Sequence, residues 1–237
     1  MKLSDILYKV SLQKMTGSTD KNINALQLDS RKVVANDLFA ALRGTKVDGH
    51  QFIDIAVKKG ATAILCEELP SELQEGVTYL QVPNAAAALS ICAENFYGNP
   101  STKLKLIGVT GTNGKTSTVT LLFRIFRALK YNVGLFSTIQ YQINEQVFSA
   151  PHTTPNSITL SQMLAQMVDE GCEFCFMEVS SHGVSQHRVS ALEFTGGVFT
   201  NMSRDHINYH GTFKAYIEAK KGFFDMLPKS AFLGLIR

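Results

Sequence analysis

One segment of the chain combines residue types that could hold the phosphates of a nucleotide. Residues 108–117 read GVTGTNGKTS and join glycines to a lysine and to hydroxyl side chains. Glycines let a backbone wrap closely around a phosphate, and a helix that follows presents free N–H groups with a partial positive charge. Lys115 could then reach the β- and γ-phosphates of ATP, and the hydroxyl of Thr116 could ligate Mg²⁺. The expected ATP-binding residues are Gly111, Thr112, Asn113, Gly114, Lys115, Thr116 and Ser117.

The spacing of this loop departs from the strict phosphate-loop pattern G-x-x-x-x-G-K-[ST]. Val109 stands where that pattern has its first glycine, and glycines recur instead at positions 108, 111 and 114. A GKT triplet alone would also suit a glycine-rich turn with a solvated lysine. Here an apolar run of strand length (103–110) precedes the loop, and a segment of helical periodicity (117–130) follows it. This context favours a strand–loop–helix phosphate site.

Two further polar residues follow apolar runs of strand length. Glu178 lies in the run 174–180, and His206 follows the run 196–201. Open α/β sheets bind ligands at the carboxyl ends of their strands, so both side chains could reach the same site. A carboxylate oxygen suits Mg²⁺. A histidine in such a position is often only a hydrogen-bonded structural residue, and Mg²⁺ prefers oxygen ligands.

Strand-like runs alternate with helical patterns along the chain, which predicts an α/β fold with a mostly parallel sheet. A cluster of turn-forming residues at 98–101 is the best candidate for a domain boundary. We therefore expect a small α/β domain at residues 1–98 and a central domain of the phosphate-loop type at residues 99–237. The expected strands are 37–42, 61–67, 78–82, 103–110, 133–138, 174–180 and 196–201; the expected helices are 52–60, 84–98, 117–130 and 157–171.

The bulk composition is that of a globular protein. The chain has 237 residues, 45% of them hydrophobic, and a formal net charge of +3. Its lysines and arginines form no block, so we expect no nucleic-acid partner. The N-terminus does not have the pattern of a signal peptide, and no apolar stretch approaches the roughly 20 residues that span a bilayer. We expect a cytoplasmic monomer without membrane insertion.

Cys172 and Cys175 form a C-x-x-C motif within a run that has the pattern of a buried strand. A zinc site would need a second pair of ligands at matching spacing, and none follows. A redox pair remains the alternative. Free cysteines are commonly buried, so the motif indicates reduced core residues.

The loop GVTGTNGKTS resembles the ATP loop of the Mur ligases and of the related folylpolyglutamate synthases. Further segments narrow the resemblance to the MurE branch of the Mur ligases and extend it over nearly the whole chain, to about residue 230. Those that resemble its N-terminal uridine-nucleotide domain and the junction after it are LDSRKV (28–33), DLFAALRG (37–44), DGHQFI (48–53) and FYGNPS (96–101). Those that resemble its central domain are HTTP (152–155), MEVSSHGVSQHR (177–188) and FTNMSRDHINYHGTFKAYIEAKK (199–221).

The resemblance implies an ATP-dependent ligase that adds a diamino acid to UDP-N-acetylmuramoyl-L-alanyl-D-glutamate, a precursor of peptidoglycan. ATP would phosphorylate the glutamate carboxylate, and the incoming amine would displace phosphate from the acyl phosphate. A carboxylate lacks a good leaving group, and phosphorylation supplies one once the protein aligns the groups and neutralises charge. ATP and Mg²⁺ are the implied cofactors. The branch uses both meso-diaminopimelate and L-lysine, and we expect the former as the commoner choice.

The same resemblance implies residue roles in the central domain. Glu178 and His206 match Mg²⁺ ligands. Lys220, by its spacing from His210-Gly211, matches a lysine that CO₂ carbamylates into a carboxylate-like ligand, with Lys221 as the neighbouring alternative. The implied catalytic residues are Lys115, Glu178, His206 and Lys220, and the implied metal ligands are Thr116, Glu178, His206 and carbamylated Lys220.

Substrate-binding roles follow in the same way. Positions that hold the muramoyl-dipeptide part are matched by Thr153, Thr154, Ser180, Gln186 and Arg188, whereas His152 could face either nucleotide or substrate. An arginine suits a carboxylate because it can pair with both of its oxygens. Leu28 and Ser30 match uridine-binding positions, and residues 45–47 match a loop that contacts the UDP part. Asp29 and Arg31 could equally form a structural pair.

The family has a third, C-terminal domain that closes over ATP and holds the incoming amino acid. The residues after Ser230-Ala231 depart from the family's usual continuation, and we expect this chain to lack that domain and the last part of the central one. On this basis we expect weak nucleotide binding without ligation. Two alternatives are a folylpolyglutamate synthase-like ligase and a non-catalytic nucleotide-binding fragment. The N-terminal segments argue against the first, because that relative lacks a matching uridine-nucleotide domain.

Overall fold

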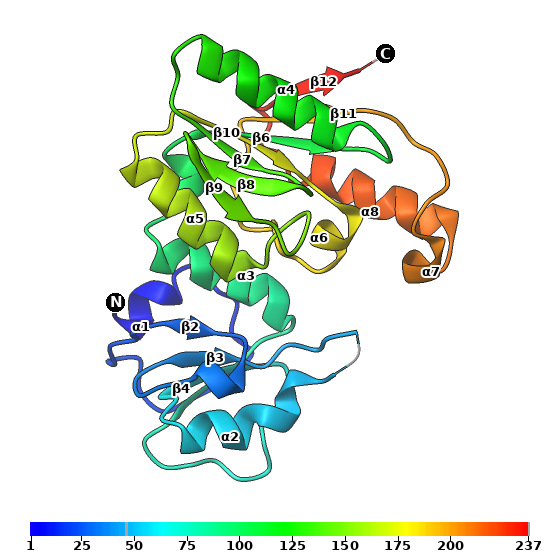
Figure 1. Ribbon diagram of the computed structural model, residues 1–237. Helices are drawn as coiled ribbons and strands as arrows, with labels where there is room; N and C mark the ends of the chain where they lie inside the picture. The colour runs from blue at the N-terminus through cyan, green and yellow to red at the C-terminus, as the bar shows by residue number, and fades with distance from the viewer. Residues whose placement is uncertain (46, 237) are drawn as a thin grey trace. The chain divides into compact units, whose positions relative to one another are not determined.

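A computed structural model describes residues 1–45 and 47–236. The chain divides into two compact units, and the division falls between Phe96 and Tyr97, two residues before the boundary expected from the sequence. Each unit is built on one sheet (Figure 1). Within the described residues, none of the helices has both the length and the apolar character needed to cross a bilayer.

The first unit has a five-stranded sheet in the order β1-β5-β4-β3-β2, in which only the β1–β5 pair is antiparallel. Helices α1 and α3 pack against each other, and the core includes Phe39, Ile64 and Tyr79 from three neighbouring strands. Its elements are α1 Leu3–Ile6, β1 Lys14–Thr16, β2 Leu26–Gln27, β3 Leu38–Ala40, α2 Ile53–Lys58, β4 Ala63–Cys66, β5 Thr78–Gln81 and α3 Ala85–Phe96, with 3₁₀ turns at Ser30–Lys32 and Gly49–Phe52.

The second unit has a seven-stranded sheet in the order β12-β11-β6-β10-β7-β8-β9. The first five strands of this order run parallel, and β8 and β9 add an antiparallel hairpin at one edge. The strands are β6 Lys105–Thr110, β7 Val133–Phe136, β8 Gln140–Ile143, β9 Gln146–Ser149, β10 Phe174–Glu178, β11 Gly196–Phe199 and β12 Phe232–Leu235. The helices are α4 Lys115–Ala128, α5 Ser157–Asp169, α6 Ser181–Ser185, α7 Ile207–His210 and α8 Phe213–Asp225, with a 3₁₀ turn at Pro100–Thr102.

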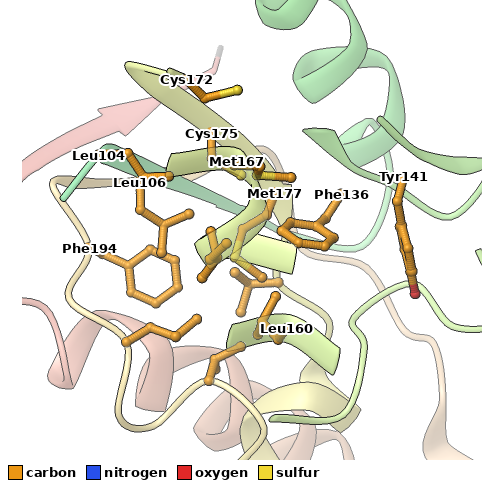
Figure 2. Close-up of a cluster of buried hydrophobic side chains, with 14 of the residues drawn as sticks. Leu104, Leu106, Phe136, Tyr141, Leu160, Met167, Cys172, Cys175, Met177 and Phe194 are labelled. Atoms are coloured by element: carbon orange, nitrogen blue, oxygen red, sulfur yellow. The ribbon is translucent and has the colours of Figure 1, made fainter. Parts of the chain in front are cut away.

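Alternating side chains of the central strands bury both faces of this sheet, as parallel strands between helices require. On one face Ile107, Val109 and Phe176 pack against Val119 and Phe123 of α4. The other face forms a larger cluster with α5 and α8, part of which Figure 2 shows. That cluster includes Leu106, Phe136, Leu160, Leu164, Met167, Cys175, Met177, Phe194 and Phe223.

Both cysteines of the C-x-x-C motif are free and lie in this second cluster (Figure 2). Burial raises the pKa of the Cys172 thiol to about 11 and raises that of Cys175 as well. A thiol with a raised pKa is a poor nucleophile, because the thiolate is the reactive form. The prediction of buried core cysteines is therefore confirmed.

The sequence pattern located most of the elements that carry the sheet, with ends shifted by a few residues. Helix α4 begins at Lys115, two residues before the expected start, since the glycine turn leads directly into it. The hairpin β8–β9 and the helix α8 are not expected from the apolar pattern. Neither is β12, which follows Ser230-Ala231 and pairs in parallel with β11.

Candidate functional site

The loop of residues 111–114 joins the end of β6 to the start of α4, as the sequence predicts. Gly114 is the N-cap residue of α4 with φ of +83°, and no side chain caps the helix. By contrast, Asn156 caps α5 and Thr212 caps α8. The first N–H groups of an α-helix have no partner within the helix, so the N-terminus of α4 is suited to an anion such as a phosphate.

A second segment holds the loop from the side. The backbone N–H of Asn113 donates to Asn201 Oδ1 at 3.0 Å, and Asn201 Nδ2 donates to the carbonyl of Asn113 at 3.1 Å. The hydroxyl of Thr200 donates to the same carbonyl at 2.6 Å. The approach is so close that a Cβ at Gly111 would lie 1.9 Å from Thr200 Oγ1. Glycine is therefore required at position 111, where φ is +146°.

Two lysines converge on this loop. Lys115 Nζ donates to the carbonyl oxygens of Gly111 at 2.9 Å and Thr112 at 2.8 Å, and Lys220 Nζ donates to Gly111 at 2.6 Å. Burial lowers the pKa of Lys115. Burial, and then the charge of Lys115, lower the pKa of Lys220 to about 7. Lys220 is 3% exposed, whereas the neighbouring Lys221 faces outward and pairs with Asp225.

Glu178 is a buried carboxylate at the carboxyl end of β10, in register with Val109 of β6. Its Oε1 accepts the backbone N–H of Thr138 at 2.7 Å, and its Oε2 accepts the Thr138 hydroxyl at 3.1 Å. Thr138 follows β7, so the two residues come from adjacent parallel strands. No lysine, arginine or histidine of the described residues forms a salt bridge with Glu178.

The residues expected to bind the muramoyl dipeptide also gather at this sheet edge. The Thr154 hydroxyl contacts the carbonyl of Glu178 at 3.0 Å and Ser180 Oγ at 3.1 Å. Arg188 Nε donates to Gln186 Oε1 at 3.0 Å, and Arg188 Nη1 donates to the carbonyl of Thr154 at 2.6 Å. Among the described residues no carboxylate pairs with Arg188, and burial lowers its pKa. Such a cation is suited to an anionic ligand.

His182 and His206 line the same pocket, and His210 lies next to them. The rings of His182 and His206 meet edge to face with centroids 5.0 Å apart, and His210 Nε2 lies 2.9 Å from Ser181 Oγ. Burial, and then neighbouring histidine charges, lower the pKa of His182 and His210. His206 is exposed, and its backbone N–H donates to Asp205 Oδ1 at 2.8 Å.

Many of these groups line one pocket of about 560 Å³. It brings together most of the predicted central-domain site residues: Thr112, Asn113, Gly114, Lys115, Thr116, His152, Thr153, Thr154, Glu178, Ser180, Arg188, His206 and Lys220. Gly111 and Gln186 do not line it but hold lining residues, and Ser117 lies in the first turn of α4. The pocket also contains Thr138, Ser181, His182 and Tyr216, for which we expect no role from the sequence alone.

The predicted uridine-binding residues lie in the first unit. Ser30 begins a 3₁₀ turn after β2 and is buried, and Leu28 precedes it. Asp29 caps this turn and forms a two-point ion pair with Arg31. This agrees with the alternative that the two residues form a structural pair. Of the expected UDP-contacting loop, Lys46 lies outside the described residues.

The pocket offers oxygen ligands for a divalent cation. The described residues contain no group of three His, Cys, Asp or Glu side chains placed to hold a metal ion. Glu178 and Thr116 nevertheless line the same pocket at the helix N-terminus. Mg²⁺ is commonly bound through one or two protein oxygens, with phosphate oxygens and waters completing its shell. The donor set therefore fits Mg²⁺ in the company of a bound phosphate.

Comparison with known proteins gives the family. The model of the Mur ligase middle domain matches residues 109–236, and that of the Mur ligase family catalytic domain matches residues 22–97. The chain belongs to the Mur ligase family. The match of the middle domain runs through β12, so the expectation that residues after Ser230-Ala231 depart from the family is wrong.

Individual Mur ligases are similar over nearly the whole chain. The UDP-N-acetylmuramoyl-L-alanyl-D-glutamate--2,6-diaminopimelate ligases of Bacteroides fragilis and Cytophaga hutchinsonii are each 53% identical to it, over 98% of this chain and 48% of theirs. A solved structure of a ligase with that name aligns with a TM-score of 0.78 and 27% identity, over 96% of this chain and 46% of that one. The chain thus spans about half the length of the curated relatives that it matches.

Proposed function

We propose that this chain forms the nucleotide- and substrate-binding part of an ATP-dependent ligase that adds 2,6-diaminopimelate to UDP-N-acetylmuramoyl-L-alanyl-D-glutamate. The observation that carries the proposal is that the uncapped N-terminus of α4, Lys115, Glu178 and Arg188 line one pocket. Relatives at 53% identity carry the name of that ligase. We also propose that the protein is cytoplasmic and monomeric and that it acts in peptidoglycan synthesis.

The phosphates of ATP would bind at the N-terminus of α4. The N–H groups of residues 114–117 supply donors, and Lys115 exchanges its bonds to the loop carbonyls for bonds to the β- and γ-phosphates. Glu178 and Thr116 would hold Mg²⁺, with His206 as a further candidate ligand. Mg²⁺ would neutralise charge on the transferred phosphoryl group.

The dipeptide part would bind on the Arg188 side. Arg188 is already oriented by Gln186 and by the carbonyl of Thr154, so it can pair with a carboxylate with little loss of side-chain entropy. Thr153, Thr154, Ser180 and His152 offer hydrogen bonds around it. We assign the uridine part to Leu28, Ser30 and the loop of residues 45–47 in the first unit.

The reaction would activate a carboxylate. One oxygen of the D-glutamate carboxylate attacks the γ-phosphorus of ATP, and ADP leaves. The amine of the diamino acid then attacks the acyl phosphate carbon, loses a proton and expels inorganic phosphate. The pocket would serve mainly to align these groups and to offset their negative charge, which are the chief means of catalysis in phosphoryl transfer.

Lys220 would act in its carbamylated form. Its pKa of about 7 leaves much of the amine neutral at physiological pH, and only the neutral amine can attack CO₂. The nitrogen forms a bond to the carbon of CO₂ and releases a proton, which gives a buried carboxylate-like group next to Lys115. Such an anion could contribute to the Mg²⁺ site, which an ammonium group could not.

Thermal unfolding with candidate ligands tests the proposed function. UDP-N-acetylmuramoyl-L-alanyl-D-glutamate and Mg·ATP should each raise the Tm, because a ligand that binds only the folded state stabilises it in proportion to occupancy. A reduced folate serves as the control ligand for the related synthases. A Tm that rises with the folate and not with the UDP-linked dipeptide would sink the proposal.

A further inference from the structure

Thr138 links the two halves of the pocket through hydrogen bonds on both sides. Its hydroxyl lies 3.1 Å from Glu178 Oε2 and 3.1 Å from Thr153 Oγ1, while its backbone N–H donates to Glu178 Oε1 at 2.7 Å. Glu178 stands on the side assigned to Mg²⁺ and phosphate, and Thr153 on the side assigned to the dipeptide. Among the described residues, Thr138 is the one whose side chain hydrogen-bonds to both Glu178 and Thr153.

The backbone of Thr138 is fixed, so its side chain is the part free to respond. The preceding Ser137 is buried, and its hydroxyl and its N–H both donate to the carbonyl of Gln140, which closes the turn between β7 and β8. The N–H of Gln140 returns to Ser137 Oγ at 3.1 Å. The N–H of Thr138 is thereby held toward Glu178, and rotation of the hydroxyl remains available.

The two hydrogen bonds of the Thr138 hydroxyl depend on each other. Thr138 has one hydroxyl proton and two acceptors within reach. The hydroxyl of Thr138 donates toward both Glu178 Oε2 and Thr153 Oγ1, so one proton is shared between the two acceptors, of which the carboxylate is the stronger. Because one proton serves both bonds, a stronger bond to Thr153 weakens the bond to Glu178.

We propose that Thr138 is a positioning residue that transmits occupancy of the dipeptide side to the Glu178 carboxylate. An anionic ligand that accepts the Thr153 proton makes the Thr153 oxygen a better acceptor, and the shared Thr138 proton is then drawn toward Thr153 and away from Glu178. Glu178 Oε2 then becomes a better ligand for a cation. The dipeptide substrate and the Mg·nucleotide complex should therefore bind with positive coupling, an inference that rests on the proposed function.

Binding measurements test the transmission. Calorimetry measures the affinity of the chain for a non-hydrolysable ATP analogue in the presence of Mg²⁺. The titration is carried out with and without UDP-N-acetylmuramoyl-L-alanyl-D-glutamate. The wild-type chain should bind the analogue several-fold more tightly when the dipeptide is present, and linkage requires the reciprocal effect. Thr138→Val removes the hydroxyl and keeps the N–H bond, so at least half of the coupling should be lost. Thr138→Ser should restore it.

The matched control is Thr195→Val, which changes an exposed threonine that does not line the pocket. It should leave the coupling unchanged. If Thr138→Val retains the full wild-type coupling, or if Thr138→Ser loses as much as Thr138→Val, the proposal is overturned.

Unfolding measurements keep the inference separate from the proposed function. A double-mutant cycle of Glu178→Gln and Thr153→Val is measured twice, once with Thr138 in place and once in the Thr138→Val background. Their effects on the unfolding equilibrium constant should deviate from additivity by about twofold or more with Thr138 in place, and should become additive with Thr138→Val. A wild-type chain that binds neither ligand would contradict the proposed function. Additive effects with Thr138 in place would overturn the bridge itself.

Discussion

The side-chain amines of Lys115 and Lys220 both donate to the carbonyl oxygen of Gly111, at 2.9 and 2.6 Å. Lys115 comes from the start of α4 and Lys220 from the middle of α8, so the phosphate loop joins the two helices at this oxygen. Two amines so close cannot both remain charged without cost, and Lys220, which is buried, has the lower pKa. The loop therefore holds one cation and one amine that is neutral above about pH 7.

The neutral amine of Lys220 should react reversibly with CO₂. With ¹³C-labelled bicarbonate, carbon NMR should show one carbamate signal at pH 8. The signal should fall as the pH drops through about 7, because the amine becomes protonated. Lys220→Ala should abolish the signal. Lys221→Ala is the matched control and should keep it, because Lys221 is exposed and paired with Asp225. A signal that follows Lys221 would contradict the assignment.

Asn201 should matter for nucleotide binding although it does not line the pocket. Asn201→Ala removes both bonds to the backbone of Asn113. A hydrogen bond contributes about 0.5–1.5 kcal/mol, so we expect the affinity for ADP to fall roughly threefold to tenfold. Calorimetry measures the change. Asn201→Asp keeps an acceptor for the Asn113 N–H but loses the donor. An Asn201→Ala chain that binds ADP like the wild type would show that the loop holds its shape without this clamp.

Arg188 should discriminate between the two ligands. It has no carboxylate partner among the described residues, and we assign it to a substrate carboxylate. A charge-assisted hydrogen bond contributes about 1.5–3 kcal/mol, so Arg188→Met should weaken binding of the UDP-linked dipeptide roughly tenfold to a hundredfold. Fluorescence titration with ADP provides the control, and the ADP affinity should stay within about twofold of the wild type. Equal losses for both ligands would place Arg188 in a general structural role instead.

The close packing between β6 and α8 should make Gly108 sensitive to substitution. A Cβ at Gly108 would lie 2.4 Å from Phe223 Cζ and 2.9 Å from Phe194 Cε1, in the core of the second unit. Overpacking of this kind costs about 1–3 kcal/mol, so Gly108→Ala should lower the free energy of unfolding by that amount. Urea denaturation checks it. Gly222→Ala is the comparison: its Cβ would lie 3.3 Å from Val184 Cγ1, and alanine favours a helix by about 1 kcal/mol.

The sequence located those parts of the site that depend on local chain geometry. The residue types at 111–117 predict a turn followed by a helix, and Glu178 comes at the end of an apolar run. The order of strands and helices therefore predicts that the two segments meet at one edge of the sheet. The core cysteines could be expected for the same reason, since Cys175 lies within a buried strand.

The parts that escaped prediction depend on contacts between distant segments. The sequence around Thr138 carries no motif that indicates a functional residue. The role proposed for Thr138 depends on the turn that Ser137 closes, which brings Thr138 next to Glu178. Asn201 acts through the backbone of a residue 88 positions away. The hairpin β8–β9 is joined at Asn144 and Glu145 without a glycine, so it lacks the usual signal of a tight turn.

The central claim is that the loop at the start of α4 holds the phosphates of a nucleotide through Lys115. Calorimetric titration of the chain with Mg·ADP, beside Lys115→Ala and the surface control Lys221→Ala, tests it most directly. We expect one binding site in the wild type, an affinity within about twofold of that value for Lys221→Ala, and at least a tenfold loss for Lys115→Ala, since charge-assisted bonds to phosphate are removed. Equal affinity of the wild type and Lys115→Ala, or no binding of Mg·ADP by either, would contradict the account.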